Sequence, residues 1–431
     1  MKKRLLALAV MLALLFACAA PAMADEGDVI IVQNKTAEET QEPENSAAGP
    51  DDREDRKEYV ADEVGFVSFE NIERRMYKEN LKIEMMDATI DTLQEVDYKS
   101  IRSQLEAGLA MIDQQVLAMQ QAAAMEPIGA QVAITSLQTQ AAELEEQLVS
   151  IKSGRLQEDN EGIIAQLEAS RDALVMGGET MFLALKAMET QDGALQRQLT
   201  ALNRTVEEME LRYEMGQISA LQLAELKAGR SSLVSGMKTL QMNIEVYKSQ
   251  LEQFLGAKIT GDITLGAVPE VTEAQIAAMD VEKDWKACRR QNYDIYAADI
   301  AAAQAEEDFE KAEKAYDEDA YEYRAAENAL DAAEATYQDT VQTKELSFRS
   351  LYAQVLDCKQ ILENARVSLQ CEEEAYRASE LKYQQGTISQ NALLTAEDEL
   401  RAAQETVENA ANDLFAAYNT YCWAAGRGIL N

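Results

Sequence analysis

The sequence predicts an all-α protein built from long antiparallel coiled-coil helices in two tandem structural repeats. Three observations support this fold class. Proline occurs after residue 62 only as Pro127 and Pro269, whereas the helix formers Ala, Glu, Gln, Leu and Met dominate. Apolar residues recur every seven positions through long stretches, which is the spacing of a coiled-coil seam. A motif with a central glycine, Gly216 in one copy and Gly386 in the other, occurs twice at an offset of 170 residues.

The chain begins with the pattern of a secretion signal. Basic residues 2–4 precede the apolar residues 5–16, and a small-x-small cleavage site ends at Ala24. The apolar run is too short to span a membrane comfortably, so we expect an exported protein cleaved after Ala24. The residues before Cys18 also resemble a lipobox, so lipidation at Cys18 stays open as the alternative.

The next segment is acidic and polar and contains two of the prolines, which predicts a disordered leader. In a third region, Ile259 to Gly266 followed by Pro269, apolar and polar residues alternate over too few positions for a sheet. This pattern predicts an extended connector. The expected organisation is a signal peptide (1–24), a leader (25–62), a first helical repeat (63–256), the connector (257–274) and a second helical repeat (275–431).

Composition excludes several classes of function. The formal net charge of −37 would repel nucleic acid and anionic lipid. The chain has no histidine, which removes the commonest general base and most zinc sites, and we find no phosphate-binding loop. We therefore predict no enzyme activity, no cofactor and no metal site. The cysteines of the body lack CxxC spacing, and no pairing can be chosen among Cys288, Cys358, Cys371 and Cys422.

Each copy of the repeated motif has the residues of a tight reversal between two helices. Gly216 and Gly386 are placed to end one helix in the left-handed conformation. Ser219 and Ser389 are placed to cap the next helix, and Gln222 completes a capping box in the first copy only. Forty residues further on, each repeat has another glycine, and these two glycines, Gly256 and Gly426, are expected at the ends of the returning helices.

The stretches that flank the motifs carry the seven-residue spacing. Small alanines follow the large apolar residues of the last stretch, which permits close approach of two helices. The stripes are Leu226, Leu233, Leu240, Tyr247 and Phe254; Val355, Leu362, Leu369, Tyr376 and Tyr383; and Leu393, Leu400, Val407, Leu414 and Tyr421 with Ala396, Ala403, Ala410, Ala417 and Ala424.

These motifs resemble those of the TolC family of outer-membrane efflux proteins, over about 360 residues of the chain. Residues 66–95 also look like the first helix of that family. The resemblance implies a homo-trimeric conduit that works with a periplasmic adaptor protein and an inner-membrane transporter, in the cell envelope. It also implies that the two turns form the tips on which the adaptor docks, with the partner-docking residues Tyr213, Gly216, Gln217, Ile218, Ser219, Tyr383, Gly386, Thr387, Ile388 and Ser389.

The chain departs from the family where membrane strands are expected. Residues 306–337 are dense in Ala, Glu and Asp, and residues 111–199 are rich in Gln, Ala, Leu and Met, so both windows predict helix. We therefore expect a TolC-like helical body with little or no β-barrel, and contact with a membrane stays open.

Two classes of function follow. The first is a TolC-like component of an efflux or export system, a conduit or scaffold that docks adaptor and transporter through its turns. The alternative is a structural coiled-coil spacer or tether of the cell envelope without transport activity.

Overall fold

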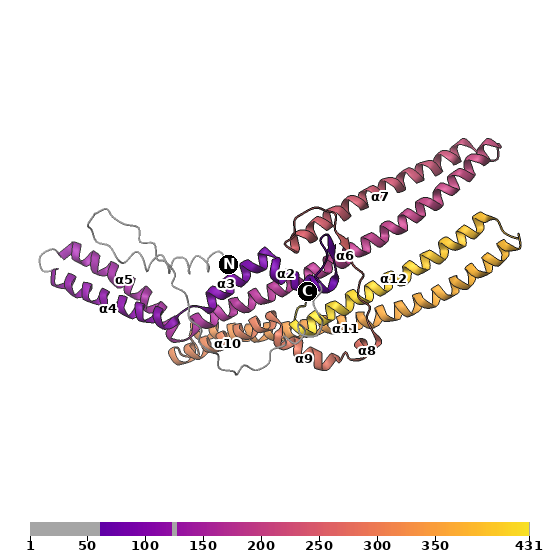
Figure 1. The fold of residues 1–431 in the computed structure, drawn as a ribbon. Coiled ribbons are helices and arrows are strands. Elements are labelled where there is room, and N and C mark those ends of the chain that lie inside the picture. Colours follow the sequence, from indigo (N-terminus) through magenta and orange to yellow (C-terminus); the bar gives the residue numbers. More distant parts are fainter. Residues whose placement is uncertain (1–60, 123–126, 431) are drawn as a thin grey trace, which may run out of the picture. The chain divides into compact units, whose positions relative to one another are not determined.

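The computed structural model describes residues 61–122 and 127–430 (Figure 1). The predicted signal peptide, with Ala24 and Cys18, lies outside the described residues, as does nearly all of the predicted leader. Contacts group residues 60–431 into one unit, and the description below concerns that unit.

Helices account for almost all of the described chain, which confirms the predicted all-α fold class. The strands β1 (Phe66–Val67) and β2 (Thr264–Leu265) have two residues each and pair in parallel. The helices are η1 (Phe69–Asn71), α2 (Ile72–Glu79), α3 (Leu81–Gln94), α4 (Tyr98–Ala122), α5 (Pro127–Lys152), α6 (Arg155–Glu214), α7 (Ala220–Phe254), α8 (Glu273–Ala277), α9 (Val281–Gln291), α10 (Tyr293–Ala315), α11 (Tyr321–Gln384) and α12 (Gln390–Arg427).

Two long helical hairpins dominate the unit, α6–α7 and α11–α12 (Figure 1). Helix α11 has 64 residues and would be roughly 96 Å long if straight. The predicted seam between α11 and α12 is confirmed in the half that lies away from the turn, where the large and small stripe residues are buried. Toward the turn the large stripe residues are half-buried, and Tyr383 at the end of the stripe is exposed. The buried stripe residues are Val355, Leu362, Ala410, Leu414, Ala417, Tyr421 and Ala424.

Each repeat has its own hydrophobic core, away from the turns. The first core gathers β1, α2, α3 and parts of α6 and α7, with the end of α12. The second gathers α9 and the adjoining parts of α11 and α12. The chain has two tryptophans, and each core contains one of them, Trp423 in the first and Trp285 in the second.

In each repeat, a buried asparagine lies between two consecutive helices, and we call this arrangement the asparagine joint. Asn80 ends α2 and caps α3 by accepting from the Lys82 and Ile83 amides, at 2.8 and 3.2 Å. Its Nδ2 donates to the Phe254 carbonyl at the end of α7, at 2.7 Å. The side chain therefore satisfies groups at the ends of two helices that lie far apart in sequence.

The second repeat has the same joint. Asn292, which is 3% exposed, accepts from the Ile295 amide at 3.0 Å and donates from Nδ2 to the Gly428 carbonyl at 2.7 Å. The two joints show that the repeat extends to hydrogen bonds that the turn motifs alone do not specify.

The returning helices end at glycines that pass very close to these joints. Gly256 has φ 63°, and a Cβ there would lie 2.0 Å from the Glu79 carbonyl oxygen. In the second repeat the left-handed glycine is Gly428, at φ 69°, where a Cβ would lie 2.6 Å from the Asn292 nitrogen. The prediction that Gly426 ends the last helix is wrong by two residues, because α12 continues to Arg427 until the chain meets the joint.

A buried glutamate holds the connector after α7. The Glu252 carboxylate accepts from the amides of Thr260 and Gly261, both at 2.7 Å, and from the Thr260 hydroxyl at 2.5 Å. Burial raises the pKa of this carboxyl, but the three hydrogen bonds outweigh burial and lower its pKa below the usual value.

Replacing Glu252 with glutamine is expected to destabilise the protein by about 1–2 kcal/mol at pH 7, because the amide cannot accept all three bonds. A carboxyl with a lowered folded-state pKa contributes stability above its unfolded pKa of about 4.3 and loses it as the pH falls through the folded-state pKa. The difference in unfolding free energy between wild type and variant, measured by urea titration, should therefore shrink from pH 6 to pH 3. A difference that stays constant would show that the carboxylate charge does not hold the connector.

The described residues of both windows in which strands were in question are predominantly helical, as predicted. Helices α4 and α5 form a hairpin between α3 and α6 in the first repeat. In the second repeat α10 passes into α11 through a short loop, so the α4–α5 hairpin has no counterpart there. Within the described residues, no helix is both long enough and apolar enough to cross a membrane.

Candidate docking tips

The turn between α6 and α7 is a Schellman motif. The Gly216 amide donates to the Tyr213 carbonyl at 2.9 Å, and the Gln217 amide donates to the Arg212 carbonyl at 2.8 Å. Gly216 has φ 71°, which confirms its predicted left-handed conformation. Arg212 in the last turn of α6 also places a positive charge at the negative end of the helix dipole.

The turn between α11 and α12 repeats this geometry bond for bond. The Gly386 amide donates to the Tyr383 carbonyl, and the Thr387 amide donates to the Lys382 carbonyl, both at 2.9 Å. Gly386 also has φ 71°. One difference is that the Thr387 hydroxyl adds a bond to the Lys382 carbonyl, at 2.8 Å.

Serine caps start both returning helices, as predicted. The Ser219 Oγ accepts from the Gln222 amide at 3.2 Å, while Gln222 Oε1 accepts from the Ser219 amide at 3.0 Å. This is a complete capping box. Ser389 accepts from the Ala392 amide at 3.2 Å, and alanine at that position leaves the second cap without the reciprocal bond.

Both turns are uncharged and exposed, which is unusual in a chain with 27% charged residues. Residues 215–224 and 383–396 contain no charged side chain. A Cβ at Gly216 or Gly386 would meet no atom of the described residues within 4 Å, so packing against that part of the chain requires neither glycine. Large apolar side chains surround the turns and are exposed to solvent: Leu211, Tyr213, Met215, Leu221, Leu381 and Tyr383.

The two turns belong to hairpins that contact each other along α6 and α12. Arg197 pairs with Glu405, and Arg204 pairs with Asp398. The spacing is seven residues on both helices, so the two pairs lie on one antiparallel seam. Nearer the turns, Asn391 Nδ2 donates to Glu208 Oε2 at 3.4 Å.

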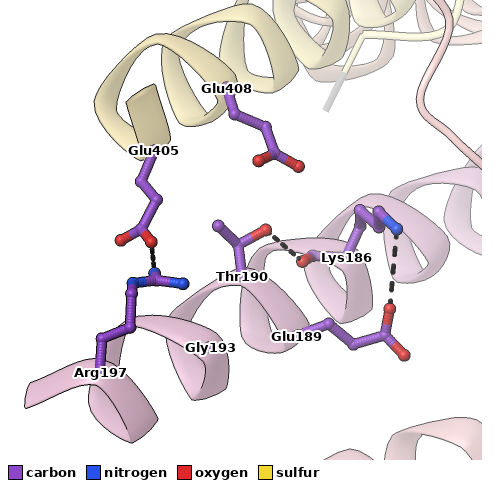
Figure 2. A pocket seen from close by; sticks show the side chains of 7 residues that line it. All are labelled: Lys186, Glu189, Thr190, Gly193, Arg197, Glu405 and Glu408. Atoms are coloured by element: carbon purple, nitrogen blue, oxygen red, sulfur yellow. Dashed lines mark hydrogen bonds and ion pairs between the residues drawn. The ribbon is translucent and has the colours of Figure 1, made fainter. Parts of the chain in front are cut away.

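A pocket of about 220 Å³ lies on this seam, where Gly193 leaves room between α6 and α12 (Figure 2). Figure 2 shows Arg197 pointing toward Glu405, and Lys186 toward Glu189 at 3.8 Å. Glu189 also pairs with Lys248 of α7 at 3.0 Å. The Arg197–Glu405 and Lys248–Glu189 pairs connect different helices of the chain, so we assign the pocket to the contact between the hairpins and not to a ligand.

Near the cores, a buried carboxylate accepts hydrogen bonds across the same seam. Glu179 Oε2 of α6 accepts from Asn419 Nδ2 and from Trp423 Nε1 of α12, both at 2.7 Å. The seam between the two repeats therefore has polar contacts from the cores toward the turns, in addition to the apolar contacts of Phe415 and Trp423 in the first core. This polar character distinguishes it from the apolar seam inside the α11–α12 hairpin.

The residues predicted for docking lie in two groups, one in each turn. Their sequence pattern specified the glycines and caps correctly, but it did not point to the exposed apolar residues beside them. The seven-residue spacing of Arg197 and Arg204 on α6, and of Asp398 and Glu405 on α12, is visible in the sequence and could have indicated the polar seam.

Among the described residues, no disulfide joins the cysteines of the body, Cys288, Cys358, Cys371 and Cys422. Burial raises the pKa of the Cys288 thiol to about 12, so this cysteine behaves as a core residue.

No family model matches the sequence, and no curated protein matches it. Solved structures are similar to it at 14–16% identity. For the CmeC outer membrane channel of Campylobacter jejuni, the TM-score is 0.47 at 14% identity, over 67% of this chain and 68% of the channel. The outer membrane protein VceC of Vibrio cholerae gives 0.47 at 15%, over 83% and 96%. The MtrE outer membrane channel of Neisseria gonorrhoeae gives 0.43 at 16%, over 64% and 72%.

All three of these proteins are outer-membrane proteins. Because the TM-scores lie below 0.5, we base the proposed function on the residues and contacts of this chain.

Proposed function

We propose that this protein is a TolC-like component of an efflux or export system of the cell envelope. In this role its two turns dock a periplasmic adaptor, which connects it to an inner-membrane transporter. The observation that supports the proposal is the pair of turns, which share one hydrogen-bond pattern, one glycine conformation and one uncharged, exposed surface.

The geometry favours a helical-hairpin tip as the docked element. Each turn presents bare backbone at a left-handed glycine, with exposed apolar side chains on the helices beside it. A second hairpin tip can approach such a surface closely without leaving a charge unpaired. Two equal turns on adjoining hairpins would offer two such positions per chain.

A spacer or tether would need the hairpins but not these surfaces. Long helices held by capped turns would suffice, and charged residues at the turns would then improve solubility. The absence of charge from both turns favours docking over the spacer.

Replacing Gly216 and Gly386 together with asparagine is expected to abolish adaptor binding and to leave the fold intact. Asparagine tolerates the left-handed conformation, and its side chain has open space within the chain. We therefore expect a loss of stability of about 1 kcal/mol or less per site. Binding should fall at least about tenfold if an adaptor packs on the bare backbone. Adaptor recovered with the tagged chain, measured by quantitative mass spectrometry, tests this expectation.

The matched control is asparagine at Gly236, an exposed glycine in the middle of α7, away from both turns. Adaptor recovery should be unchanged in that variant, although asparagine is also a weak helix former. If the double variant at the turns keeps wild-type recovery of the adaptor, the turns are not the docking surface.

A further inference from the structure

The α4–α5 hairpin differs in charge from the rest of the chain. Residues 107–142 contain only two charged residues, Asp113 and Glu126, in a chain with 27% charged residues. The acid-rich stretch around the α10–α11 loop, residues 306–339, has the opposite composition. A copy of this protein therefore has a long helical surface that repels a second copy only weakly, although its net charge is −37.

The hairpin has one packed seam. Leu105 and Ile112 of α4 and Ile134 and Leu148 of α5 are its buried residues, and Leu144 lies over Gly108. Among the described residues, α4 packs mainly against α5, and α5 also contacts α6. Near its base, Asn160 of α6 donates to the Tyr98 hydroxyl at 2.8 Å. Two helices with a single seam bury little apolar area on their own.

Within residues 61–122 and 127–430, no element is seen to cover the face of α4 opposite the seam, and this face lacks charge. At 100° per residue, this face is bounded by Met111 and Leu117, which are 56% and 58% exposed. Small and neutral residues occupy its centre, and all of them are exposed: Ala107, Ala110, Gln114, Ala118 and Gln121. On α5, Val132 is 68% exposed. Small residues between larger apolar ones permit close packing of another helix.

The composition of the segment favours a helix over a lipid surface as the occupant of this face. Helices that lie on membranes carry Lys and Arg on the polar side and commonly Trp or Phe on the other. Residues 107–142 contain no basic residue and no aromatic residue. They are rich in Ala, Gln and Met, which suit the inside of a helical bundle.

We infer that the α4–α5 hairpin is a self-association surface, and that it pairs with the α4–α5 hairpin of a second copy of this chain. The pairing converts two single-seam hairpins into a bundle in which each outer face is covered. Because residues 107–142 are sparsely charged in an acidic chain, two copies can meet there at a small electrostatic cost. This inference does not rest on the docking role of the turns.

The test uses near-isosteric charge substitutions in the full chain. Gln114→Glu with Gln121→Glu gives an acidic variant, and Gln114→Lys with Gln121→Lys gives a basic one. All three residue types have similar helix propensity, so helicity should be unchanged. By sedimentation velocity, the wild type should self-associate, and each variant should associate at least about tenfold more weakly because like charges face each other. An equimolar mixture of the two variants should recover association.

Gln338→Glu with Gln342→Glu on α11 is the matched control, since it adds the same charge at exposed positions. Its association should equal that of the wild type. The inference is overturned if the wild type is monomeric at tens of micromolar, if the acidic variant associates like the wild type, or if the mixture fails to associate. Flotation of the wild type with phosphatidylcholine vesicles, lost in both variants, would assign the face to lipid and would also overturn it.

Discussion

Replacing Gly256 with alanine is expected to destabilise the first repeat by about 3 kcal/mol. The left-handed conformation costs an alanine about 1–2 kcal/mol, and overpacking adds about as much again. The Cβ would lie 2.0 Å from the Glu79 carbonyl oxygen, so the end of α7 must move away from α2. That movement would also weaken the bond from Asn80 to the Phe254 carbonyl.

The measurement is urea unfolding followed by the fluorescence of Trp423, in a background where Trp285 is replaced by phenylalanine. Trp423 belongs to the first core, so its signal reports the repeat that is changed. Gly216→Ala is the matched control, because it has the same backbone conformation and open space around the Cβ. The control should cost about 1 kcal/mol. Equal losses in the two variants would show that the close approach of Gly256 to α2 contributes nothing.

The second large effect is expected for Asn292→Asp, at about 3 kcal/mol above neutral pH. The aspartate still accepts from the Ile295 amide, but it places a buried carboxylate against the Gly428 carbonyl in place of a donor. Burial and the facing carbonyl should raise the pKa of the introduced carboxyl. The loss should therefore grow as the pH rises from about 4 through that raised pKa, since the protonated form can still donate.

Trp285 fluorescence in a Trp423→Phe background reports the second core and measures this loss from pH 4 to pH 8. Asn292→Ala is the control, because its loss should not depend on pH in the same way. An Asn292→Asp loss without pH dependence would mean that the introduced carboxyl does not face the Gly428 carbonyl.

The turns and the helical seams could be predicted because their determinants are local or periodic. A left-handed glycine followed by a serine cap specifies its own hydrogen bonds within about ten residues, as at Gly216 and Ser219. A seven-residue stripe specifies which helix face is buried, as at Leu414 and Tyr421. Both kinds of signal can be found without knowing which helices are neighbours.

The joints could not be predicted in the same way, because their partners are far apart in the sequence. Asn80 lies in residues 66–95, which resemble the first helix of the TolC family, but no local feature of the sequence indicates that its side-chain amide donates to the Phe254 carbonyl. Glu252 was one acid among many on helix surfaces, and its role depends on how the connector returns to α7. The end of α12 at Gly428 likewise depends on where the chain meets Asn292.

The candidate site was predicted residue by residue at the glycines, and less well beside them. The exposed apolar side chains of Met215 and Leu221 follow from the position of the turn at the free end of a hairpin. The sequence marks them only by a local lack of charge.

The most direct test of the docking role is photo-cross-linking from the turns in intact cells. A photoreactive residue at Gln217 or Thr387 should form a cross-link to a periplasmic adaptor protein, identified by mass spectrometry. The same residue at Gln354, exposed on the middle of α11, should not. Cross-links from both turns to one adaptor are the predicted result. Cross-links from the turns only to other copies of this chain, or equal adaptor cross-linking from Gln354, would contradict the docking role.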